Sequence, residues 1–124
     1  MPESPYKGKT GVQRVFNALG YSLDGLSAGW KNEAAFRQVA LLGCVGIVVA
    51  FIVPLHAWAR AVVIASHLLT VIVELLNSAI EAAVDHTSLE RHELAKRAKD
   101  LGSAAQLICL INLAAMWALG LTGT

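Results

Sequence analysis

The chain has 124 residues, of which 56% are hydrophobic and only 15% are charged, and its formal net charge is +1. Soluble domains carry about 25% charged residues, so the composition, with a mean hydropathy of +0.56, excludes an ordinary soluble globular protein. We expect one all-α domain over residues 1–124 that is integral to a membrane and has no nucleic-acid partner.

Residues 1–11 are expected to form a flexible tail, and no cleaved signal peptide is expected because Met1–Lys31 lacks its apolar core. Residues 12–31 are expected to form an amphipathic surface helix, since their apolar side chains recur at helical spacing. Those side chains are Val12, Val15, Phe16, Leu19, Leu23, Leu26 and Trp30. Glycines 20, 25 and 29 each cost about 1 kcal/mol relative to Ala, so we expect this helix to be bent or interrupted. It serves either as an anchor or to bring a lipid headgroup to a reaction centre.

Three apolar segments are each long enough to cross a bilayer, which requires about 20 residues. They cover residues 32–54, 57–85 and 88–121. Asn32 is a good helix cap for the first segment. Thr87 and Glu90 form a capping-box pattern, so the third segment is expected to start near Ser88 as a cytoplasmic helix that continues into the membrane.

The positive charges predict the orientation of these segments. Nine of the ten Lys and Arg residues flank the start of the first segment or lie between the second and third. They are Lys7, Lys9, Arg14, Lys31, Arg37, Arg91, Lys96, Arg97 and Lys99. The first loop has only Arg60. The N-terminus and the second loop are therefore expected to face the cytoplasm, and the first loop and the C-terminus to face outward.

The second apolar segment carries a polar stripe along one face. Its members are His67, Thr70, Glu74, Asn77, Ser78, Glu81 and Asp85, which fall within an arc of about 100° on a helix. Ionisable groups are costly inside a membrane, so the stripe predicts a functional site that faces protein, water or a cation. The alternative is a polar seam that only joins helices, although such a seam does not require repeated negative charge.

Carboxylates next to a basic loop favour metal-assisted phosphate chemistry. Glu81 and Asp85 repel each other at a spacing of four, so a cation or a cationic partner is needed if both stay ionised. Mg²⁺ binds one or two carboxylates together with substrate phosphates. Glu33 can supply a further oxygen, Lys99 can neutralise phosphate charge, and Glu74 can accept a hydroxyl proton.

Three blocks of the sequence resemble the bacterial diacylglycerol kinases of the inner membrane. They are NEAAFRQ at 32–38, VELLNSAIEAAVD at 73–85 and ERHELAKRAKDLGSAA at 90–105. The resemblance implies three transmembrane helices preceded by a surface helix, and a homotrimer with active sites between subunits. It also implies transfer of the γ-phosphate of MgATP to the primary hydroxyl of diacylglycerol, which gives phosphatidic acid.

The resemblance also implies roles for individual residues. Glu74 would be the general base, with Asn77, Lys99 and Asp100 in the same catalytic centre, and Glu33 and Glu81 would hold Mg²⁺. The ATP-binding residues would be Arg14, Tyr21, Glu33, Glu81, Glu90, Arg91, His92, Lys99 and Asp100. The lipid would contact Arg14, Ala18, Ser27, Trp30, Ala35, Gln38, Val39, Glu74 and Ser103.

Three alternatives stay open from the sequence. Undecaprenol kinases share the fold and the catalytic blocks, although SAIEAAVD and HELAKRAKD favour the diacylglycerol branch. A small proton or cation channel would instead line a pore with His67, Glu74 and Glu81, and phosphoryl transfer in detergent micelles would argue against it. A structural subunit without chemistry would leave the acidic face without a purpose.

Overall fold

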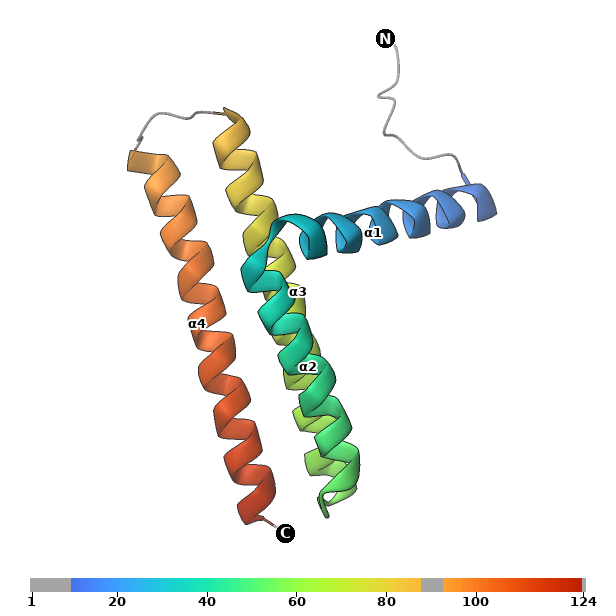
Figure 1. Ribbon diagram of the computed structural model, residues 1–124, viewed down its shortest axis with the longest axis vertical. Helices are drawn as coiled ribbons and strands as arrows, with labels where there is room; N and C mark the ends of the chain where they lie inside the picture. Colours follow the sequence, from blue (N-terminus) through green and yellow to red (C-terminus); the bar gives the residue numbers. More distant parts are fainter. Residues whose placement is uncertain (1–9, 88–92, 124) are drawn as a thin grey trace. The chain divides into compact units, whose positions relative to one another are not determined.

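The structure, a computed structural model, describes residues 10–87 and 93–123. Four helices make up these ranges: α1 (Val12–Asn32), α2 (Ala34–Ile52), α3 (Ala57–Thr87) and α4 (Glu93–Thr122) (Figure 1). No strand occurs in the described ranges, and α2, α3 and α4 are long and apolar enough to cross a membrane. The predicted all-α fold with three membrane helices is confirmed. Ser88 and Glu90, on which the expected capping box and helix start depend, lie outside the described residues.

Helix α1 is continuous through Gly20, Gly25 and Gly29, so of the predicted bend or interruption the interruption is wrong. Glycine lowers helix stability but keeps its backbone N–H, and the hydrogen-bond ladder therefore continues. Asn32 ends α1 instead of capping the next helix. The break falls at Glu33, whose backbone is extended and whose N–H donates to the Gly29 carbonyl at 2.9 Å.

Helix α3 packs against both α2 and α4 (Figure 1). Small residues lie buried at these contacts, on α2 at Gly43, Gly46 and Ala50 and on α4 at Gly102 and Gly120. Small side chains let helix backbones approach closely, which favours association in a membrane. The contacts fix which side chains of α2 and α4 meet the polar stripe of α3.

The turn between α2 and α3 is closed by Arg60. Its Nε donates to the Ala50 carbonyl at 2.8 Å, and its Nη2 lies 3.4 Å from the Val53 carbonyl. The last carbonyls of a helix have no partner within the helix, and a cation there also interacts well with the helix dipole. Arg60, in the first turn of α3, therefore caps the end of α2.

Large apolar side chains cover the outside of the three membrane helices. Examples more than half exposed are Val45, Phe51, Ile52, Ile72, Leu76, Leu107, Ile108 and Ile111. Such a surface suits hydrocarbon, while the helices satisfy their own backbone groups. The chain is a multi-pass membrane protein.

Candidate functional site

The part of the polar stripe from His67 to Asn77 is buried within the chain. His67, Thr70, Glu74 and Asn77 are each at most 9% exposed, whereas Glu81 is half-buried and Asp85 is exposed. The buried members face the other helices of the same chain. The stripe therefore divides at about Asn77 into a buried part and a more open part that continues towards Asp85.

At the end of α3 nearer to Ala57, polar groups of α4 bond to α3. The Trp117 indole Nε1 donates to His67 Nε2 at 2.9 Å, and the rings meet edge to face with centroids 6.1 Å apart. Asn112 Nδ2 donates to Ser66 Oγ at 3.3 Å. These contacts match the polar-seam interpretation, because interhelical hydrogen bonds hold membrane helices together.

Glu74 lies in the middle of α3 and is 5% exposed. Gln106 Nε2, on α4, donates to Glu74 Oε1 at 3.0 Å and to the Thr70 carbonyl at 3.2 Å. Gln106 was not among the residues predicted from the sequence. The sequence marks Gln106 as an amide within the otherwise apolar residues 104–111. Its contact with Glu74, however, depends on how α3 and α4 pack.

Asn77 lies between Glu74 and the open part of the stripe. Its Nδ2 reaches Glu81 Oε1 at 3.5 Å, a long contact between residues four apart. Its Oδ1 is buried and accepts no hydrogen bond from the described residues. A Cβ on Gly102 of α4 would overlap this oxygen. Gly102 therefore leaves the space that the Asn77 amide occupies.

Lys99 supplies a cation to the acidic end of α3. Its Nζ lies 2.6 Å from Asp85 Oδ1, so Asp85 has the cationic partner that the sequence required for the Glu81 and Asp85 pair. Lys99 precedes the apolar part of α4, which begins at Leu101. The hydrogen bond with Asp85, with the charges of Asp85 and Glu81, raises the pKa of Lys99 above its ordinary value.

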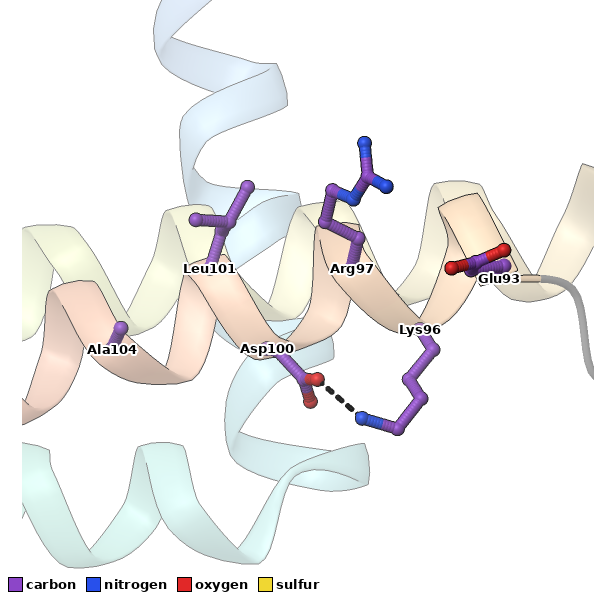
Figure 2. Close-up of a pocket in the computed structure, with 6 residues that line it drawn as sticks. All are labelled: Glu93, Lys96, Arg97, Asp100, Leu101 and Ala104. Atoms are coloured by element: carbon purple, nitrogen blue, oxygen red, sulfur yellow. Dashed lines mark hydrogen bonds and ion pairs between the residues drawn. The ribbon is translucent and has the colours of Figure 1, made fainter.

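A shallow pocket lies beside the first turns of α4 (Figure 2). Its lining residues are Glu93, Lys96, Arg97, Asp100, Leu101 and Ala104. Lys96 Nζ and Asp100 Oδ2 lie 2.7 Å apart, and this contact raises the pKa of Lys96. Figure 2 shows Arg97 pointing away from that pair. Asp100, a predicted catalytic residue, is thus exposed and paired with a lysine of its own helix.

The remaining predicted residues belong to other parts of the chain. Arg14, Ala18, Tyr21, Ser27, Trp30 and Glu33 belong to a separate compact unit that contains α1. Ala35, Gln38 and Val39 lie in the first turns of α2, and Ser103 is exposed on α4. Glu90, Arg91 and His92 lie outside the described residues. Within residues 10–87 and 93–123, no three His, Cys, Asp or Glu side chains are arranged to hold a metal ion.

Comparisons with known proteins agree on one family. A family model described as prokaryotic diacylglycerol kinase matches residues 20–121. A Pseudomonas aeruginosa protein named Diacylglycerol kinase is 55% identical over 123 residues, which cover 99% of this chain and 100% of that protein. Relatives with the same name are 49% identical in Escherichia coli, covering 87% of this chain and 88% of the relative. In Helicobacter pylori the identity is 48%, over 93% of this chain and 89% of the relative.

Proposed function

The chain belongs to the prokaryotic diacylglycerol kinase family, and from this premise we propose where and how its phosphoryl transfer takes place. It phosphorylates diacylglycerol, as its family and the names of its relatives state, with ATP as the phosphoryl donor. The proposed reaction centre is the part of the α3–α4 interface from Glu74 to Asp85. The observation that carries the proposal is a buried carboxylate, Glu74, held by a hydrogen bond from α4.

Glu74 is proposed to act as the general base. Its carboxylate accepts the proton of the lipid hydroxyl as the hydroxyl oxygen forms a bond to the γ-phosphorus of ATP. The bond between the γ-phosphorus and the bridging oxygen breaks, and ADP leaves. Such proton transfer typically contributes 10²–10⁴-fold to the rate, about 3–5 kcal/mol of barrier.

Lys99 and Glu81 are proposed to organise the phosphates and the metal. The Lys99 ammonium lies beside the acidic end of α3, where it can balance phosphate charge. The donor chemistry fits Mg²⁺, because that ion needs only one or two carboxylates in addition to ATP phosphates and water, and Glu81 offers one. Bound Mg²⁺ would neutralise charge on the transferring phosphate. Glu33 remains a proposed further oxygen ligand.

The other assignments from the sequence are proposals of the same kind. Asn77 and Asp100 are proposed to support the catalytic centre. The nucleotide would also contact Arg14, Tyr21, Glu90, Arg91 and His92. The lipid would contact Arg14, Ala18, Ser27, Trp30, Ala35, Gln38, Val39 and Ser103.

The enzyme is proposed to work as a homotrimer in the bacterial inner membrane with its N-terminus in the cytoplasm. The orientation is supported by the nine basic residues on one side of the membrane against Arg60 on the other. Trimer formation is supported by the family resemblance and by the incomplete burial of the stripe, since Glu81 is only half-buried within one chain.

The test is transfer of radiolabelled γ-phosphate from ATP to a panel of lipid alcohols in detergent micelles with Mg²⁺. We expect diacylglycerol to be labelled in preference to undecaprenol, and Glu74→Gln to lower kcat by about 10²–10⁴-fold while the oligomer still assembles. Near-normal turnover of Glu74→Gln at saturating ATP and lipid would exclude Glu74 as the base. Labelling of undecaprenol alone would exclude diacylglycerol as the substrate.

A further inference from the structure

Gln106 is a buried amide whose two N–H groups are both engaged with α3. It is 8% exposed, and its Nε2 donates to Glu74 Oε1 at 3.0 Å and to the Thr70 carbonyl at 3.2 Å. The Thr70 hydroxyl donates to the Ser66 carbonyl at 2.8 Å, so this hydroxyl is already engaged within α3. The Gln106 amide thus links the side chain of Glu74 to the backbone one turn before it.

The partners of this amide determine its orientation. Both Glu74 Oε1 and the Thr70 carbonyl are acceptors, so the amide nitrogen must face them. The amide oxygen then points elsewhere, and Gln106 Oε1 is buried without a hydrogen bond from the described residues. An unsatisfied buried acceptor is costly, so the amide is set here by what its N–H groups hold, the buried Glu74 carboxylate and the Thr70 carbonyl. Packing alone does not account for this amide.

We propose that Gln106 is the positioning residue of the base: its amide fixes Glu74 Oε1 and so orients the second carboxylate oxygen towards the lipid hydroxyl. This inference rests on the proposed role of Glu74 as general base. A carboxylate in an apolar interior can rotate about its last side-chain bond, and a misplacement of about 1 Å at a reacting group can lower the rate by about 10²-fold. The link to the Thr70 carbonyl removes that freedom, because it anchors the amide to the α3 backbone.

The neighbouring amide, Asn112, provides a matched control. It lies on the same helix, and its Nδ2 donates to Ser66 Oγ on α3 at 3.3 Å. It therefore contributes an interhelical hydrogen bond as Gln106 does, but to a residue outside the proposed centre. If Gln106 only joined the helices, removal of either amide would have the same consequence.

The experiment measures kcat and the KM values for ATP and diacylglycerol of Gln106→Met, Gln106→Asn and Asn112→Leu in micelles, with thermal unfolding as the check of folding. Met keeps the volume without a donor, and Asn keeps an amide that is one methylene too short to reach both acceptors. We expect both Gln106 variants to lose about tenfold to a hundredfold in kcat with KM values within about twofold. Asn112→Leu should keep kcat within about twofold.

Three results would overturn the proposal. The first is a kcat within about threefold of the unmodified enzyme for Gln106→Met. The second is an equal loss in Asn112→Leu. The third is loss of the folded state in both Gln106 variants, which would assign Gln106 to helix packing. Glu74→Gln is measured in the same series to separate the two proposals. If Glu74→Gln is inactive and Gln106→Met is active, only the positioning role of Gln106 is rejected. If Glu74→Gln is active, the role of Glu74 as general base is rejected.

Discussion

Gly46 of α2 is the position where one added methyl group should disturb the helix packing most. It lies against the imidazole of His67, which is 2% exposed and accepts the Trp117 hydrogen bond. A Cβ on Gly46 would overlap Nε2 and Cε1 of the ring and lie 2.9 Å from its Cδ2. Gly46→Ala must therefore displace either the ring or the α2 backbone.

The expected cost follows from three contributions. Overpacking of a tight interior costs about 1–3 kcal/mol, and loss of the hydrogen bond between Trp117 and His67 costs about 0.5–1.5 kcal/mol. Ala replaces Gly in a helix interior, which returns about 0.5–1 kcal/mol. Gly46→Ala should therefore lower the free energy of unfolding by about 0.5–4 kcal/mol.

The control is Gly43→Ala, one turn earlier on the same helix face. A Cβ there would lie 3.5 Å from Val71 Cγ2, an ordinary van der Waals distance. Reversible unfolding of both variants in mixed detergent micelles measures the difference, and Gly43→Ala should be neutral or slightly more stable. Equal stabilities for the two variants would refute the packing of Gly46 on His67. His67→Ala combined with Gly46→Ala should cost less than the sum of the single changes, because the overlap disappears.

The proposed metal site, the α2–α3 turn and the assembly each allow a direct test. Glu81→Ala should raise the Mg²⁺ concentration needed for half-maximal turnover, and an unchanged Mg²⁺ titration would remove Glu81 from the metal site. Arg60→Met removes the donors to two carbonyls and should lower the unfolding free energy by about 1–3 kcal/mol, whereas an unchanged value would deny the cap. Mixed trimers of Glu74→Gln and Lys99→Ala chains should stay inactive, because both residues lie on one α3–α4 interface; recovered activity would show that they act in one site from different subunits.

The sequence predicted the helices and the polar face because both depend on local periodicity. A helix places residues three and four apart on one side, so the stripe from His67 to Asp85 could be assigned to one face before any packing was known. Three apolar segments, each longer than the roughly 20 residues needed to cross a bilayer, likewise predicted three membrane helices. These features require no information about neighbouring helices.

Contacts between helices could not be predicted from the sequence, because they depend on how the helices pack. Whether Gln106 or another residue of α4 meets Glu74 depends on the register of α3 against α4, which small residues such as Gly102 set through close packing. The boundary between α1 and α2 was also predicted wrongly from local sequence. Asn32 has a good capping side chain, yet the chain turns extended at Glu33, because tertiary structure routinely overrides a modest local preference.

The two interpretations of the polar stripe apply to different parts of α3. From Glu74 towards Ala57, the seam interpretation holds, because Asn112 and Trp117 of α4 satisfy Ser66 and His67. From Asn77 towards Asp85, the side chains keep an unsatisfied buried oxygen, a long 3.5 Å contact and a lysine-paired carboxylate. A seam would not leave the Asn77 amide incompletely paired, whereas the proposed site for phosphates and a hydroxyl needs such groups available. Glu74 lies where the two parts meet, so under the proposed function one end of the interface would hold it while the other would present substrate.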